Sequence, residues 1–339
     1  MKSFLFDIGH PAHVHLFRNV ISFLRSKSCF VVVTSRDKDL THRLLDHYGI
    51  EYYCLSRATT SVWGMTAELF KRDVRLLSLH RRFKFRAALG TSSCIAHLTA
   101  LAGVPSFVFE EDDDAVVPLF SAITYPFATG IVVPECLRFK RWRKKRIIHR
   151  SYHELAYLHP DDFFPDSKVP EKYGLIPGKY IIIRHSALQA HHDRRIGGLM
   201  PDIMDVVRKE LRKFHVVTTR ERQKNGKIDP WDMHHVMAYS KLVVSDSQTM
   251  TMESACLGVP SIRYNSFVGN ISYLEEAERV YDLTYGFRPG EEKQMLRKIR
   301  ELVATPDTKK LWQEKRDRMI EDKENLSQWL RVFAGSLLA

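Results

Sequence analysis

The sequence has 339 residues, of which 44% are hydrophobic and 27% are charged, a balance typical of soluble globular proteins with two cores. It has no run of about 18 or more uncharged apolar residues, and its five scattered cysteines give no signal of a zinc site or a disulfide framework, so reduced thiols in the cytoplasm are expected. The net charge of +12 favours anionic partners, such as nucleotide phosphates, nucleic acid or an anionic membrane surface.

The N-terminal half alternates short apolar strands with helices. A first strand is predicted at Ser3–Ile8, and the turn Gly9–Ala12 leads into an amphipathic helix at His13–Ser26. This alternation indicates a parallel sheet covered by helices on both faces. The further predicted strands are Phe30–Ser35, Glu51–Leu55, Ala87–Gly90, Ser106–Glu110 and Gly130–Val133, and the further helices are Lys38–Tyr48, Trp63–Arg82, Ser92–Ala102 and Leu119–Tyr125.

The segment Leu158–Lys179 is rich in Pro, Asp and Gly and is the best linker candidate. The strand–helix alternation restarts after it, at Tyr180–Arg184. We therefore expect two Rossmann-like domains, at residues 1–165 and 166–339, with a cleft between them that holds the active site and with the last helices packing back on the first domain. The other predicted strands are Phe214–Thr219, Leu242–Ser245 and Ser261–Tyr264, and the helices are Met200–Lys213, Trp231–Tyr239, Thr249–Leu257 and parts of Pro289–Val332.

The segment Ser245–Pro260 joins a strand to a helix through Ser-Asp-Ser. Ser247 is a natural N-cap, and the N–H groups and dipole of the helix after it can seat an anion. Glu253 falls on the first or second turn of that helix, where a carboxylate can accept both hydroxyls of a ribose. A plain strand–cap–helix unit, in which Glu253 only complements the helix dipole, fits the spacing equally well.

The motif S-D-S-Q-T-M-T-M-E-S-A-C-L-G-V-P resembles the nucleotide-binding signature of GT-B enzymes. It is especially similar to T-D-S-G-G-x-x-x-E-x-x-x-L-G-x-P of the non-hydrolysing UDP-N-acetylglucosamine 2-epimerases. The resemblance implies diphosphate contacts at Ser247, Gln248 and Thr249 and a ribose contact at Glu253. The Gly-Gly pair of that family is Gln248-Thr249 here, a departure that affects how closely the backbone can approach a ligand.

The chain as a whole is similar to a family of GT-B-like proteins found in archaea and in bacterial polysaccharide clusters. This resemblance implies an α/β GT-B fold for the whole chain. The stretches that carry it are DIGHPAHVHLF, HELAYLHPDDFFPD, IIIRHSALQAHHD and SDSQTMTMESACLGVP.

The loop Asp7–His13 resembles the glycine-rich loop, ending in His-Val, of the GlcNAc transferase that makes lipid II. That match implies a substrate contact around Gly9 and places His13 near the reacting centre, where a neutral imidazole can act as general base. His10 is the second candidate. One of these histidines could instead cap the helix while the other packs structurally. Together with His15 they could also suggest a metal, but the spacing is loop-like and only Asp7 is close, so we predict no metal site.

Basic side chains in the second half are candidates for the diphosphate. Arg184 ends a predicted strand, and Arg220 follows another. His185 comes next to Arg184 on the same predicted loop. His191, His192 and Asp193 lie further along it, where an ordinary solvated loop is nearly as good an interpretation.

Five carboxylates, Glu110–Asp114, follow a predicted strand. Clustered carboxylates raise each other's pKa, so one could act as acid or base, and together they could bind Mg²⁺, although GT-B enzymes usually need no catalytic metal. Glu110 aligns with a catalytic Glu of the 2-epimerases. Those epimerases also need an Asp in a G-D-T loop, which reads Gly90-Thr91-Ser92 here. The missing carboxylate at Thr91 argues against epimerisation.

We therefore predict a metal-independent glycosyltransferase without a cofactor. It would move a sugar from a nucleoside diphosphate donor, expected to be UDP-linked, to a polysaccharide or lipid-linked acceptor, with His13, Glu110 or Glu111 taking the acceptor proton. The alternative is a sugar-nucleotide 2-epimerase or hydrolase. No nucleic-acid-binding motif is recognised. The basic run Arg138–Arg150 is either a solvated face or a peripheral contact with the inner face of the membrane.

Overall fold

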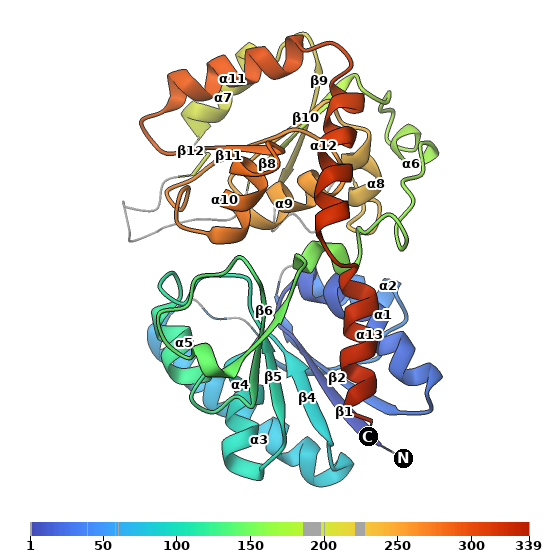
Figure 1. Ribbon diagram of the computed structural model, residues 1–339, viewed down its shortest axis with the longest axis vertical. Coiled ribbons are helices and arrows are strands. Elements are labelled where there is room, and N and C mark those ends of the chain that lie inside the picture. Colours follow the sequence, from blue (N-terminus) through green and yellow to red (C-terminus); the bar gives the residue numbers. More distant parts are fainter. Residues whose placement is uncertain are drawn as a thin grey trace. The chain divides into compact units, whose positions relative to one another are not determined.

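The computed structural model divides the chain into two compact units, shown in Figure 1. Unit 1 comprises Met1–Tyr157 and Glu324–Ala339, and unit 2 comprises Leu158–Lys323. The predicted boundary between residues 165 and 166 lies inside unit 2. The structure describes residues 2–38, 40–57, 59, 61–185, 198–199, 201–220 and 228–338, apart from the side chains at 62, 202 and 220.

Unit 1 is built on a seven-stranded sheet in the order β3-β2-β1-β4-β5-β6-β7, with every neighbouring pair parallel. Its central strand, β1, is buried along its whole length, which explains its unbroken apolar pattern. The sequence prediction stops at β6, because basic residues around Ile147 and Ile148 obscure the strand pattern of β7. The strands are β1 (Ser3–Ile8), β2 (Phe30–Asp37), β3 (Tyr53–Arg57), β4 (Ala87–Gly90), β5 (Ser106–Phe109), β6 (Gly130–Pro134) and β7 (Arg146–His149).

Helices cover both faces of this sheet. On one face α1 (Pro11–Ser26) contacts α2 (Thr41–His47) and the C-terminal helix α13 (Leu326–Ser336). On the other face α3 (Val62–Phe83), α4 (Ser93–Ala102) and α5 (Pro118–Thr124) contact one another in series. Two short 3₁₀ helices, η1 (Arg143–Lys145) and η2 (His153–Ala156), complete the unit. Among the helices that the structure describes, none is long and apolar enough to cross a membrane.

Unit 2 is built on a five-stranded parallel sheet in the order β12-β11-β10-β8-β9. Neighbouring helices α8, α9 and α10 lie on one face, whereas α7 and α11 contact each other on the opposite face. The strands are β8 (Tyr180–His185), β9 (His215–Arg220), β10 (Leu242–Ser245), β11 (Ser261–Tyr264) and β12 (Thr284–Phe287). The helices are α6 (Lys168–Glu171), α7 (Pro201–Glu210), α8 (Met233–Ala238), α9 (Gln248–Cys256), α10 (Ser272–Arg279), α11 (Glu292–Ala304) and α12 (Thr308–Asp322).

The predicted α/β class is confirmed in both units. Each sheet has a point at which the strand order reverses direction: β1 is flanked by β2 and β4, and β8 is flanked by β9 and β10. Open α/β sheets bind ligands outside the carboxyl ends of the strands at such a point. The candidate ligand sites are therefore the carboxyl ends of β1 and β4 in unit 1 and the carboxyl ends of β8 and β10 in unit 2.

Candidate functional site

In unit 1 the carboxyl ends of β1 and β4 lie side by side, with Asp7 paired in register with Gly90. A Cβ atom at Gly90 would lie 2.7 Å from the backbone oxygen of Asp7, so only glycine permits this close approach. Gly90 therefore brings the two segments that follow these strands together. One is the loop Ile8–Pro11 that leads into α1, and the other is Thr91 and Ser92, which lead into α4.

Asp7 is completely buried, and its carboxylate connects β1 to the segments around it. Its carboxylate lies 2.6 Å from the guanidinium of Arg72 on α3 and accepts hydrogen bonds from the hydroxyl groups of Thr34, at 2.7 Å, and Ser92. Burial opposes the charge on Arg72, but the negative groups around it, led by Asp7 and joined by Glu68 and Asp73, together outweigh burial, so the pKa of Arg72 is raised. With its charge matched inside the fold, Asp7 acts as a structural residue rather than a proton acceptor.

His10 is the N-cap of α1, since its Nδ1 accepts a hydrogen bond from the Ala12 N–H at 3.3 Å. Its ring centroid lies 5.7 Å from that of His13. The capping role considered for one of these histidines therefore falls to His10. At Gly9 an added Cβ would meet nothing within 4 Å, so packing does not require a glycine there.

His13 lies in the first turn of α1, with its Nδ1 2.7 Å from the hydroxyl oxygen of Thr91. Its pKa is lowered well below the ordinary value, first by burial and then by electrostatic repulsion from the basic groups of His10, His153 and Lys38. The imidazole is therefore neutral near pH 7, which is the form that can accept a proton.

The third histidine, His15, lies further along α1 and stacks on Tyr157 with a centroid distance of 5.1 Å. The three histidines therefore do not converge. Within the described parts of the chain, no group of three or more His, Cys, Asp or Glu side chains is arranged to hold a metal ion.

The carboxylates of the acidic segment after β5, Glu110–Asp114, fall into two groups with different roles. Asp113 accepts a hydrogen bond from the backbone N–H of Arg138 at 2.5 Å, and Asp114 accepts from those of Lys140 and Arg141, both at 2.9 Å. These two carboxylates hold the loop between β6 and β7 in place, so their role is structural.

Glu110 and Asp112 are the residues of this segment whose pKa values are shifted. Burial, followed by the charge of Asp112, raises the pKa of Glu110 to about 8. Burial and the charge of Glu111 raise the pKa of Asp112 to about 7. One Glu110 oxygen accepts from the N–H groups of Glu111 and Asp112, both at 3.2 Å, while Glu111 lies 3.2 Å from Nδ1 of His153. This edge therefore holds a carboxyl group that stays protonated near neutral pH.

In unit 2 the turn between β10 and α9 is fixed by three hydrogen bonds. The Ser245 hydroxyl accepts from the Ser247 N–H at 2.9 Å, and the Asp246 carbonyl accepts from the Asn265 side chain at 2.9 Å. Ser247 is the N-cap of α9 and accepts from the Met250 N–H at 3.4 Å, which confirms its predicted capping role. Gln248 and Thr249 are the first two residues of the helix, where N–H groups have no carbonyl one turn earlier.

Arg184 is paired in register with Ser245, so the two side chains lie on the same face of the sheet. Its neighbour His185 lies with Nδ1 3.4 Å from the carboxylate of Asp246, which is buried. Arg220 ends β9 opposite His185, but its side chain lies outside the described residues, as do His191, His192 and Asp193.

Glu253 lies in the second turn of α9 with 6% of its surface exposed. Its Oε1 lies 2.9 Å from Nε2 of His234 on α8, which is equally buried. The resemblance to the 2-epimerases implies a ribose contact at Glu253, but this partner was not predicted from the sequence. His234, Asp246 and Asn265 are the residues of this region that sequence reasoning missed, because each acquires its contact only when separate elements pack.

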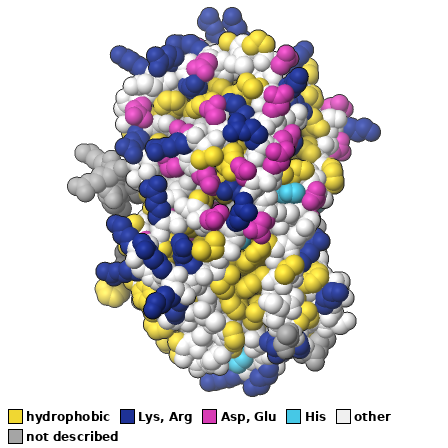
Figure 2. Space-filling model, viewed as in Figure 1, with side chains coloured by type: hydrophobic (Ala, Val, Ile, Leu, Met, Phe, Trp, Pro, Cys, Tyr) yellow, Lys and Arg dark blue, Asp and Glu magenta, His cyan; other side chains and the backbone are white. Residues whose placement is uncertain are grey.

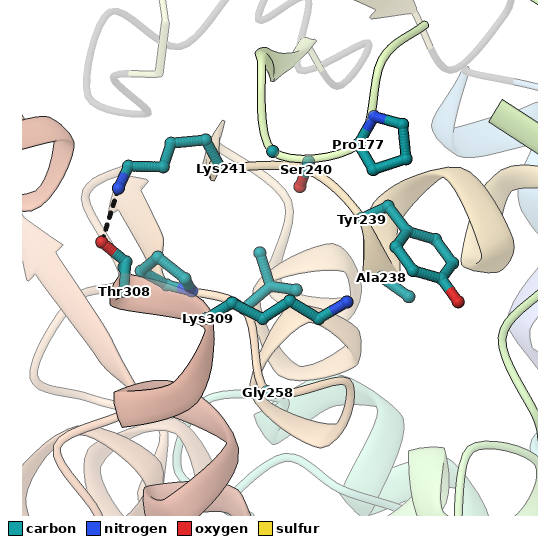
Figure 3. Close-up of a pocket in the computed structure, with 11 residues that line it drawn as sticks. Pro177, Ala238, Tyr239, Ser240, Lys241, Gly258, Thr308 and Lys309 are labelled. Atoms are coloured by element: carbon teal, nitrogen blue, oxygen red, sulfur yellow. Dashed lines mark hydrogen bonds between the residues drawn. The ribbon is translucent and has the colours of Figure 1, made fainter. Parts of the chain in front are cut away.

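A small cavity of about 180 Å³ lies at the other end of the second sheet, near the amino ends of β10 and β11 (Figure 3). Lys241 donates a hydrogen bond to the hydroxyl of Thr308 at its edge, at 2.6 Å. Lys309 lies with its ammonium 4.1 Å from the centroid of the Tyr239 ring. Because parallel α/β sheets bind ligands at the carboxyl edge, this cavity is separate from the candidate site.

The chain belongs to the family described as "Protein of unknown function (DUF354)", whose model matches residues 3–284. Comparison with curated protein sequences found no match. Among solved structures, the chain is similar to UDP-N-acetylglucosamine 2-epimerase from Rickettsia bellii, with 15% identity, a TM-score of 0.69 and coverage of 99% of this chain and 97% of that one.

Two further solved structures have the same fold. One is S. aureus MnaA in its co-structure with UDP, with 13% identity, a TM-score of 0.66 and coverage of 96% and 92% of the two chains. The other is the glycosyltransferase of kitacinnamycin, with 11% identity, a TM-score of 0.61 and coverage of 99% and 100%. These likenesses confirm the GT-B architecture of the chain.

Proposed function

We propose that this DUF354 member is a glycosyltransferase. It moves a sugar from a nucleoside diphosphate donor, a UDP-sugar, to a hydroxyl of a polysaccharide or lipid-linked acceptor. The observation that carries the proposal is the contact of His13 with Thr91. A neutral imidazole suits proton removal from a hydroxyl, and the threonine stands where the resemblance to the 2-epimerases would require a carboxylate. Neither a metal nor a separate cofactor is required.

Unit 2 supplies the nucleotide site in this proposal. The N–H groups at Gln248 and Thr249 and the dipole of α9 attract the diphosphate, and Arg184 adds positive charge from the same face of the sheet. Glu253 accepts the ribose hydroxyls. Its hydrogen bond with His234 fixes the direction of the carboxylate.

Unit 1 supplies proton transfer. The acceptor oxygen forms a bond to the anomeric carbon as the bond from that carbon to the diphosphate breaks, and the acceptor proton passes to His13 Nε2. For this step Nδ1 must carry the proton that is donated to Thr91, since that tautomer leaves Nε2 as the basic nitrogen. Glu110, which is protonated near neutral pH, is the second candidate for proton transfer.

A 2-epimerase or hydrolase is the second candidate function. Two observations favour it: the solved structures with this fold include several described as UDP-N-acetylglucosamine 2-epimerases, and Glu110 has the raised pKa of a residue that can exchange a proton. The absence of a carboxylate at Thr91 weighs against epimerisation.

The test separates nucleotide binding from reaction type. A thermal-shift screen of nucleoside diphosphates and their sugars identifies the donor, because ligands of the folded state raise stability by mass action. The donor is then incubated alone and followed by NMR. The transferase proposal predicts an unchanged donor until a glycan or lipid-linked acceptor is added. Formation of an epimer or of free sugar without acceptor, at the rate of a catalysed turnover, would overturn it in favour of the second candidate.

A further inference from the structure

The outer surface of the α3–α4–α5 layer in unit 1 exposes large apolar side chains. On α3, Trp63 is 86% exposed and Phe70 is 71% exposed, and on α5 Leu119 is 74% exposed. Val74 and Leu101 are also exposed, on α3 and α4, as is Phe127 just after α5. Single exposed apolar residues are ordinary, but a series on three neighbouring helices is a feature of interaction surfaces. We call this series the apolar face.

One side chain links the three helices that carry the apolar face. His97 on α4 lies with Nδ1 2.8 Å from the Asp73 carboxylate on α3 and with Nε2 3.0 Å from the Ile123 carbonyl on α5. The His97 ring also contacts that of Phe127, at a centroid distance of 5.7 Å. Val74 is adjacent to Asp73 in the chain, and Leu101 lies one helical turn after His97. His97 therefore joins the three helices that carry the exposed apolar residues into one layer.

A basic loop adjoins the apolar face. Lys145 donates to the carbonyls of Tyr125, Pro126 and Ala128, which ties the segment between β6 and β7 to the end of α5. The backbone N–H groups of Arg138 and Lys140 donate to the Asp113 and Asp114 carboxylates, which holds the start of the same segment. The exposed side chains of this basic loop are Arg138, Lys140, Arg141, Arg143 and Lys144.

Positive charge also accompanies the apolar residues on α3. Lys71, Arg75, Arg81 and Arg82 are exposed, whereas the two acidic residues of this helix, Glu68 and Asp73, are paired with Arg36 and His97. Figure 2 shows Lys and Arg side chains gathered on the left of the view over the segment between β6 and β7, next to hydrophobic side chains.

We propose that the apolar face and the basic loop form a surface that docks on an anionic lipid bilayer. Apolar side chains on helices enter the boundary between headgroups and acyl chains, and flanking Lys and Arg residues are attracted by anionic headgroups. Nucleic acid would use the cations but would gain little from exposed Phe70, Leu119 and Val74. The docking needs no nucleotide and stands independently of the proposed reaction.

The experiment measures co-sedimentation of the full chain with vesicles. Vesicles with about one-third phosphatidylglycerol should bind the protein, and vesicles of phosphatidylcholine alone should bind it at least roughly tenfold more weakly. The paired variants Phe70→Ser with Leu119→Ser, and Arg141→Glu with Lys144→Glu, should each lower the affinity for the anionic vesicles by roughly tenfold or more.

Matched control variants lie in unit 2. Phe164→Ser removes another apolar side chain, 75% exposed, and Lys293→Glu with Arg297→Glu reverses two exposed charges on α11. These controls should bind anionic vesicles as the wild type does, and circular dichroism should show that every variant is folded. Equal losses in controls and test variants would overturn the proposal, since net charge alone would then explain binding.

Two other outcomes would also overturn it. If an RNA duplex binds more tightly than the vesicles and the Arg141 and Lys144 variants abolish only that binding, the surface serves nucleic acid. If vesicles do not bind and the Phe70 and Leu119 variants convert a dimer to a monomer by light scattering, the apolar face is an interface between two copies of the chain.

Discussion

Nδ1 of His13 lies 2.7 Å from the hydroxyl oxygen of Thr91, across the adjoining ends of β1 and β4. Thr91 is uncharged, so it orients the ring without stabilising an imidazolium. Burial and the nearby cations then keep the pKa of His13 low. A carboxylate at position 91 would do the opposite, because an adjacent negative charge favours the protonated ring. Thr91 therefore leaves the lowered pKa of His13 in place, whereas a carboxylate at position 91 would raise it.

The first prediction concerns this pair. Thr91→Asp should raise the pKa of His13, so NMR titration of the histidine ring should show the variant protonating at a higher pH than the wild type. Thr91→Ser retains the hydroxyl and serves as the control, with an unchanged titration. In the enzyme assay His13→Ala should lower kcat by about 10²–10⁴-fold, the usual contribution of a general base. An unaltered titration in Thr91→Asp would show that the contact does not govern the ring.

The second prediction concerns the ion pair between Asp7 and Arg72. Arg72→Met should destabilise unit 1 by about 3–5 kcal/mol, because it leaves the buried Asp7 carboxylate without its counter-charge. Combining Asp7→Asn with Arg72→Met should recover part of that loss. The free energy of unfolding of the two single variants and of the double variant is measured by urea unfolding, followed by circular dichroism. Strictly additive effects of the two single changes would contradict the coupling that we infer.

The third prediction concerns pH. The pKa of Glu110 is raised in the folded state, so the unfolded chain loses this proton at a lower pH than the folded chain does. The contribution of Glu110 to stability is therefore fully present below its ordinary pKa and is lost as the pH rises toward about 8. Glu110→Gln keeps the acceptor for the N–H groups of Glu111 and Asp112 but cannot ionise.

Thermal melts should accordingly show Glu110→Gln close to the wild type at about pH 4 and more stable than the wild type above pH 8, by a few kcal/mol at most. The exposed Glu314 provides the control, since Glu314→Gln should change the melting temperature equally at both pH values. A Glu110→Gln advantage that is the same at low and high pH would rule out the raised pKa as its source.

The sequence predicts the order of strands and helices well because buried parallel strands such as β1 have unbroken apolar patterns. It also predicts the cap at Ser247, which depends only on residues within one helical turn. Contacts between distant parts of the chain cannot be predicted from such local patterns. Asp7 meets Arg72, 65 residues away, and nothing in the local pattern around either residue identifies the other. The strand β7 is not predicted, because basic residues flank Ile147 and Ile148 and only His149 of the strand is buried, so it lacks an unbroken apolar pattern.

The last prediction concerns the proposed ribose contact. Glu253→Ala would remove the carboxylate but would also leave the buried His234 without its partner, so weaker nucleotide binding would mix two effects. Glu253→Gln retains the hydrogen bond to His234 and only removes the charge. His234→Gln instead retains Glu253 and changes the partner that orients it.

Calorimetric titration with UDP should then show the greatest loss of affinity for Glu253→Gln, about tenfold, because a hydrogen bond to a neutral acceptor is weaker than one to a charged acceptor by roughly 1–1.5 kcal/mol. His234→Gln should lose less affinity for UDP, because the carboxylate remains but is less well oriented. The control titration uses inorganic diphosphate, which has no ribose. The binding of diphosphate should be nearly equal in the wild type and in both variants, since the N-terminus of α9 is intact. If diphosphate binding falls as far as UDP binding, Glu253 maintains the helix and not the ribose contact.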